Sequence, residues 1–163
     1  QESLFSGQLP TRIVIGCVQN RGFNGAYNLN PFNFEHFNLT QVKIYLDGQQ
    51  HSIRPLETDF ANHLYVTAYT SLFAGTGKLY KDEGNGLTRE DFEGGYALYA
   101  FDLTPDLADG GHFNLLIQGN VRLELKFGAA LESTINVIAY AEFENCLEVD
   151  SAKNIIFDFK NRR

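Results

Sequence analysis

One segment near the C-terminal end constrains the fold of this chain more than any other. Residues 120–127 alternate strictly, with four apolar side chains on one face of an extended segment: Val121, Leu123, Leu125 and Phe127. A period of two is typical of a β-strand with one buried face. Residues 134–144 repeat the pattern with five apolar side chains on one face: Ile135, Val137, Ala139, Ala141 and Phe143.

We predict that these two strands form an antiparallel hairpin, because only a short polar loop at residues 128–133 separates them. The second strand also carries Ile138 and Tyr140 on its other face. It is therefore expected to be covered on both sides, by its own domain on one and by a neighbour on the other. Val137 lies in the middle of the apolar face, so Val137→Asp is expected to abolish soluble folding.

The remaining sequence predicts a β-rich domain. Apolar or alternating runs bounded by turn residues predict further strands, at residues 12–18, 39–46, 50–56, 96–103, 112–117 and 154–159. Asp47-Gly48 predicts a hairpin turn between two of them. The connections range from two residues to about thirty, which favours a jelly roll over an up-and-down barrel.

One helix is expected, between Asp59 as its N-cap and Gly75 as its C-terminal stop. Apolar residues fall at helical spacing between them: Phe60, Leu64, Ala68 and Leu72. Residues 88–91 predict a short capped helical turn. The predicted fold class is all-β, an eight-stranded antiparallel jelly-roll sandwich with one short helix, in a single domain spanning residues 1–163.

The amino-acid composition limits the classes of protein to which this chain can belong. The 13 basic and 20 acidic residues give a net charge of −7, which disfavours binding to nucleic acid. No apolar run reaches the ~18 residues of a membrane span, and the chain does not open on a signal peptide. The absence of methionine, even at position 1, indicates a fragment or a processed product. Cys17 and Cys146 lie in apolar runs and are expected to be buried, reduced thiols.

The segment at residues 20–38 is unusual, because it combines six asparagines with five large rings: Phe23, Tyr27, Phe32, Phe34 and Phe37. Asparagine and glycine favour turns, but a solvated loop should not carry so much apolar area. One interpretation is a long loop that folds back over its own sheet. The other is a loop that buries its rings against another subunit, which makes these five rings the candidate interface residues.

The sequence offers no catalytic or metal-binding pattern. The four histidines have no metal-ligand spacing: His36, His51, His63 and His112. No Gly-x-Ser-x-Gly elbow presents a nucleophile, and Gly75-Thr-Gly-Lys78 resembles a helix stop more than a phosphate loop. Acidic residues gather at residues 82–93 and 142–150, and a glycosidase would need two of them to face each other across a cleft. We expect no enzyme activity, no cofactor and no metal.

Several stretches together resemble one family. They are LFSGQLPTRIVIG (4–16), NPFNFEHFN (30–38), YLDG (45–48), YAFDLTPD (99–106) and IAYAEFEN (138–145). They are similar to the major capsid protein of Polinton/Maverick elements and adinto-like viruses, and the resemblance covers nearly the whole chain. It implies a double jelly roll that assembles as a trimer into icosahedral capsids, of which this chain resembles the C-terminal roll. It implies no catalytic residues.

The expected function is therefore that of a structural protein, a jelly-roll domain of a major capsid protein. The resemblance implies a homotrimer in the full-length protein, then other capsomers and minor capsid proteins as partners, with assembly inside the host cell and location in the virion. Two alternatives stay open: a carbohydrate- or receptor-binding β-sandwich module, and a hydrolase on a β-sandwich. A second jelly-roll-like stretch upstream in the reading frame would separate the capsid interpretation from both.

Overall fold

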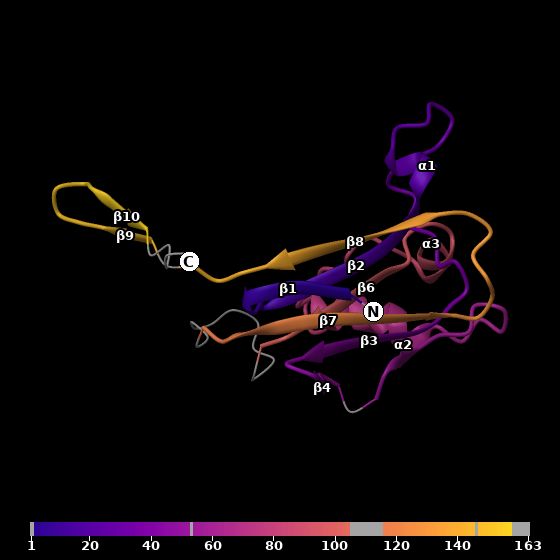
Figure 1. The fold of residues 1–163 in the computed structure, drawn as a ribbon, viewed down its shortest axis with the longest axis horizontal. Helices are drawn as coiled ribbons and strands as arrows, with labels where there is room; N and C mark the ends of the chain where they lie inside the picture. Colours follow the sequence, from indigo (N-terminus) through magenta and orange to yellow (C-terminus); the bar gives the residue numbers. More distant parts are fainter. Residues whose placement is uncertain (1, 53, 105–115, 146, 158–163) are drawn as a thin grey trace.

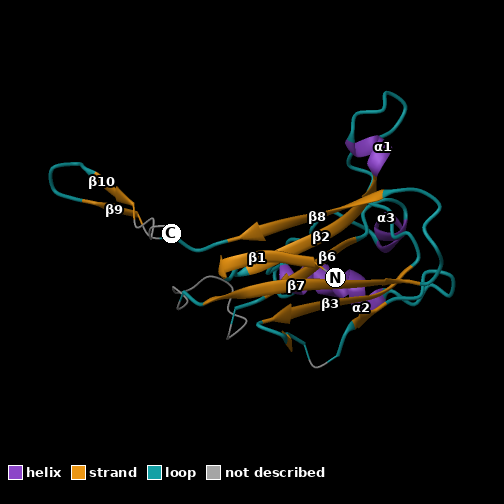
Figure 2. Cartoon of the chain, viewed as in Figure 1, coloured by secondary structure: helices purple, strands orange, loops and turns teal. Residues whose placement is uncertain are grey.

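The computed structural model describes all residues except 1, 53, 105–115, 146 and 158–163. Two antiparallel sheets face each other across one hydrophobic core (Figures 1 and 2). The first sheet has the order β1-β7-β3-β4, with β5 also paired to β3. Its strands are β1 (Glu2–Gln8), β3 (Leu39–Leu46), β4 (Gln49–Gln50), β5 (Leu56–Glu57) and β7 (Gln118–Phe127). The second sheet has the order β6-β2-β8, with β2 (Arg12–Gln19), β6 (Leu98–Asp102) and β8 (Ile135–Glu142).

The pairing of the strands is that of a jelly roll. β2 and β3 follow each other in sequence but lie in different sheets, and so do β7 and β8. β2 pairs with β8 while β3 pairs with β7, so the two crossing connections lie one over the other. This nested pairing confirms the predicted all-β, antiparallel sandwich. Eight of the ten described strands have three or more residues, and α2 is the one described helix longer than five residues.

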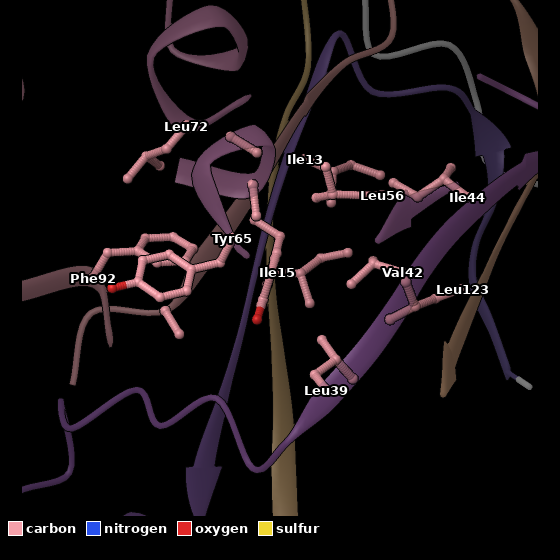
Figure 3. Packing of buried hydrophobic residues seen from close by; sticks show 14 of the residues in the cluster. Ile13, Ile15, Leu39, Val42, Ile44, Leu56, Tyr65, Leu72, Phe92 and Leu123 are labelled. Carbon is pink, nitrogen blue, oxygen red and sulfur yellow. The ribbon is translucent and has the colours of Figure 1, made fainter. Parts of the chain in front are cut away.

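The core fills the space between the sheets. Ile13 and Ile15 of β2 point toward Val42 of β3 and Leu123 of β7 (Figure 3), and all four side chains are buried. The alternation in residues 120–127 is confirmed at Val121 and Leu123, which are both buried. Burial of these aliphatic side chains is the main source of stability in such a sandwich.

The predicted hairpin between residues 120–127 and 134–144 is wrong. β7 pairs with β1 and β3, whereas β8 pairs with β2 in the other sheet. The connection at residues 128–134 crosses between the sheets instead of closing a turn. Sheets pack about 10 Å apart, a distance that seven residues span easily. A period of two marks a strand but does not identify its partner.

The expected burial of Val137 is also wrong. Val137 pairs with the buried Cys17, but 42% of its surface is exposed, because β8 is the last described strand of its sheet. An edge position leaves one side of the residue without a neighbour. Val137→Asp is therefore expected to remain soluble and folded, contrary to the prediction from the alternation.

The helix begins later than predicted. α2 spans Val66–Gly75 and packs against β6, and its end at Gly75 is as expected. Residues 59–64 form a turn, in which the Asp59 carboxylate accepts hydrogen bonds from the backbone and side-chain amides of Asn62. The positive φ of 56° at His63 ends this turn and prevents helix. Tyr65 and Phe92 then pack under α2 (Figure 3).

The remaining predictions of this kind concern a short helix, a turn and the C-terminal strands. The capped turn predicted at residues 88–91 is confirmed as α3 (Arg89–Glu93), with a capping box between Thr88 and Asp91. The Asp47-Gly48 turn is confirmed by positive φ angles at both residues. β9 (Leu147–Val149) and β10 (Ile155–Phe157) form a hairpin, in which β10 lies within the strand predicted at residues 154–159, and Figure 1 shows the hairpin standing away from the sandwich. The strand predicted at residues 112–117 falls mostly outside the described residues.

Candidate subunit interface

The connection between β2 and β3 divides into two parts. Residues 20–33, which we call the projecting loop, leave the end of β2 as α1 (Asn20–Phe23) and rise away from the sandwich (Figure 1). Residues 34–38, the anchored segment, return along the sandwich, where Phe34 forms a parallel bridge with Tyr96. The sequence predicted neither α1 nor which of the five rings lie on each part.

Local hydrogen bonds give the projecting loop a defined shape. At its base, the Asn20 backbone N–H donates to the carbonyl of Thr134 at 3.0 Å, and its side-chain amide donates to Asn136 at 3.0 Å. Further out, the backbone N–H of Leu29 donates to Ala26 at 3.0 Å. The Asn30 side chain accepts from the N–H of Phe32 at 3.0 Å. These bonds explain the asparagines, whose side chains close turns on the backbone.

Three of the five candidate rings lie on the projecting loop and face solvent. Phe23 is 54% exposed, Phe32 is 70% exposed and Tyr27 is fully exposed. The loop itself does not bury them, although its backbone is held by the hydrogen bonds above. Exposed apolar area concentrated on one protrusion is typical of a contact surface.

Charge on the projecting loop is low. Arg21 is the one charged residue among residues 20–33, in a chain whose net charge is −7. The buried centres of protein–protein interfaces are depleted in charge and enriched in aromatic side chains and arginine. The composition of the loop therefore fits a surface that binds protein better than a loop that merely stays soluble.

The other two rings, Phe34 and Phe37, lie on the anchored segment and are half-buried. Phe34 fits over Gly16 of β2, where a Cβ would lie 2.6 Å from the ring. Next to it, His36 stacks on Phe60 with ring centroids 4.0 Å apart. Burial lowers the pKa of His36, against the opposing effect of Glu93 and Glu35. The first interpretation, a loop folded back over its own sheet, therefore holds for Phe34, whereas Phe23, Tyr27 and Phe32 do not cover the sheet.

A cavity of about 580 Å³ lies beside the anchored segment, between α3 and the connection at residues 128–134. Two of the three carboxylates that line it have partners: Asn33 donates to Glu35 at 2.7 Å and the Tyr65 hydroxyl donates to Glu93 at 2.7 Å, while Glu132 is the third. The hydrogen bond from Tyr65 lowers the pKa of Glu93. A general acid needs a raised pKa, so Glu93 does not suit that role.

Several of the acidic residues singled out in the sequence have structural partners. Asp91 caps α3 by accepting from the backbone N–H of Thr88 at 2.9 Å, and Glu83 pairs with Lys78 at 3.1 Å. Near the end of β8, Glu142 pairs with Arg12 at 3.2 Å. Lys78 donates its backbone N–H to Phe73 at 2.8 Å, which confirms residues 75–78 as a helix stop.

Cys17 and the histidines are side chains that could act as a nucleophile, a base or a metal ligand. Cys17 is buried and free, as predicted, and Cys146 lies outside the described residues. His51 contacts the carbonyl of Asp102 at 2.8 Å and His63 contacts Glu93 at 3.2 Å, while His112 lies outside the described part. Within the described residues, no three His, Cys, Asp or Glu side chains gather as they would around a metal. No helix in the same part of the chain is long and apolar enough to cross a membrane.

The chain is similar to "Uncharacterized protein F54H12.2" of Caenorhabditis elegans, with 31% identity over 168 residues. The similarity covers 96% of this chain but 38% of the relative, which is therefore a much longer protein. No protein-family profile matches the chain, and no solved structure matches it.

Proposed function

We propose that this chain is a jelly-roll domain of a major capsid protein, a structural protein that assembles an icosahedral shell. The observation that carries the proposal is the projecting loop with its three exposed rings and single charge. A shell subunit must bind its neighbours through side chains that its own core does not use. This loop presents such side chains on a folded, hydrogen-bonded support.

The jelly-roll pairing of β2 with β8 and β3 with β7 supports the proposal, as does the resemblance of five stretches to Polinton/Maverick and adinto-like capsid proteins. The greater length of the nematode relative is compatible with a second roll in that protein. The proposed partners are the chain itself, as a homotrimer in the full-length protein, then other capsomers and minor capsid proteins. The proposed location is the virion, after assembly inside the host cell. The proposal includes no catalysis, no cofactor, no metal and no specific nucleic acid.

A carbohydrate- or receptor-binding module is the second candidate function, and the cavity beside the anchored segment is the observation that favours it. Amide, carboxylate and imidazole groups line this cavity together with Phe37. Polar groups around a ring are what a sugar-binding site needs. A reproducible signal on a glycan array, lost in Phe37→Ala, would favour this function over the shell.

The experiment that tests the shell function replaces two projecting rings, as Phe23→Ser with Tyr27→Ser, in the protein expressed from its full reading frame. Circular dichroism is expected to stay unchanged, because both rings are exposed, while the yield of trimers or particles falls. Leu79→Ser with Tyr80→Ser is the matched control, since these residues are 42% and 96% exposed and lie outside the projecting loop. Unchanged assembly in the double variant would remove the loop from the interface.

A further inference from the structure

The two edges of the sheet β6-β2-β8 differ. At β6, α2 lies so close that a Cβ on Gly75 would stand 2.7 Å from the Cβ of Ala100 and 2.8 Å from its carbonyl carbon. At the other edge, β8 pairs with β2 over its whole length, and no other described strand pairs with it. Among the described residues no strand pairs with the outer side of β8, which can therefore accept a further strand.

β8 lacks the features that normally protect an edge strand. Such strands usually carry lysine, proline or a bulge that blocks pairing with another chain. The one charged residue of β8 is Glu142, at its end, where it pairs with Arg12. β8 contains no proline, and its pairing with β2 shows no shift of register. Val137 and Tyr140 are both exposed on it.

We propose that two copies of this chain join at β8, with β8 of one copy pairing antiparallel with β8 of the other. A strand that pairs with the outer side of β8 must itself have a free edge without charge, and β8 of a second copy has such an edge. A chain with a net charge of −7 repels its copies over most of its surface. In an antiparallel pair centred near Ile138, the two Glu142 carboxylates lie at opposite ends, so that they do not face each other.

The projecting loop lies close to the proposed contact at β8. It leaves β2 beside Ile135, at the start of β8, and rises past the β8 edge (Figure 1). A two-fold antiparallel contact brings the loop of one copy toward the far end of the other β8, where Tyr140 and Phe143 are exposed. The exposed rings of the loop and the exposed side chains of β8 then belong to one contact.

This contact extends the proposed function by naming a partner surface, but it does not require a shell. Being two-fold, it would join neighbouring trimers in a capsid and form a simple dimer in a protein that makes no capsid. The two proposals can therefore fail separately.

Analytical ultracentrifugation of the 163-residue chain over a range of concentrations tests the contact. The wild-type chain is expected to form dimers. The double variant Val137→Lys with Tyr140→Lys places four like charges in the contact and is expected to weaken dimerisation at least about 100-fold. Leu79→Lys with Tyr80→Lys is the matched control, because it makes the same change of charge at exposed apolar residues away from β8. Circular dichroism establishes that both variants fold.

A charge-swap experiment separates the contact from a general loss of structure. Val137→Glu with Tyr140→Glu is expected to be monomeric by itself and to form a mixed dimer with the lysine variant. A wild-type chain that stays monomeric overturns the proposal and leaves the edge to a strand of another protein. Equal effects of the β8 and control variants, or no mixed dimer, also overturn it. Particle yield reports on the shell separately: particles that form normally from the β8 lysine variant would support the shell without this contact.

Discussion

Phe92 and Phe23 are the same amino acid in opposite environments, and the same substitution at each tests the division between core and projecting rings. Phe92 is 0% exposed and is the buried residue of α3. Its ring lies 5.9 Å from those of Tyr65, Tyr69 and Tyr99, measured between centroids. Phe23 lies on the projecting loop with half of its surface in solvent.

Phe92→Ala is expected to lower the free energy of unfolding by about 3–5 kcal/mol, because it removes a fully buried ring and leaves a cavity among other rings. In a domain of this size the melting temperature falls by roughly 6–20 °C for such a loss. Phe23→Ala removes a ring that is 54% exposed and lies outside the core between the sheets. Its expected cost is below about 0.5 kcal/mol, which is typical of surface substitutions.

Urea and thermal denaturation followed by circular dichroism measure both values, at a concentration where the wild-type chain is monomeric. Phe92→Leu is the control, since it keeps most of the buried volume and should cost clearly less than Phe92→Ala. If Phe23→Ala destabilised the chain as much as Phe92→Ala, the projecting rings would be a lid on the core. The argument for a contact surface would then fail.

Two further predictions concern β2. Burial raises the pKa of the Cys17 thiol to about 11, so in Cys146→Ser protein Ellman's reagent should react only after unfolding. The thiol of the unfolded chain ionises at lower pH, so the free energy of unfolding should fall as the pH rises from about 9 to about 11. The fall should be smaller in Cys17→Ala, which lacks this thiol. Identical pH profiles for the two proteins would contradict this prediction. Gly16→Ala should cost about 1–3 kcal/mol by pressing on Phe34 and Leu98. Adding Phe34→Leu should recover part of that loss, and strictly additive losses would show that the two residues do not touch.

The elements that the sequence predicts well are those with a local cause. The alternation of Val121 and Leu123 needs only one buried face, and the Asp47-Gly48 turn needs only the backbone freedom of two residues. Strand pairing depends on residues that are far apart in the sequence. The sequences of β7 and β8 therefore resemble a hairpin, although the two strands lie in different sheets. Burial of Val137 was mispredicted for the same reason, since alternation does not show that a strand is an edge.

The candidate interface was predictable in composition but not in shape. Five rings among asparagines indicate an unusual loop, yet they do not show which rings project. The position of Phe34 depends on Gly16, which lies in β2, outside the loop, and leaves space for the ring. β1 was not predicted, because residues 2–8 carry little apolar alternation. Its position in the sheet is set by its pairing with β7.

Electron microscopy of the protein expressed from its full reading frame tests the central claim most directly. The account predicts closed, regular particles in which the projecting loop, with Phe23, Tyr27 and Phe32, lies at a boundary between subunits. A well-folded protein that forms no particles at any concentration, with these three rings still in solvent, would contradict the account.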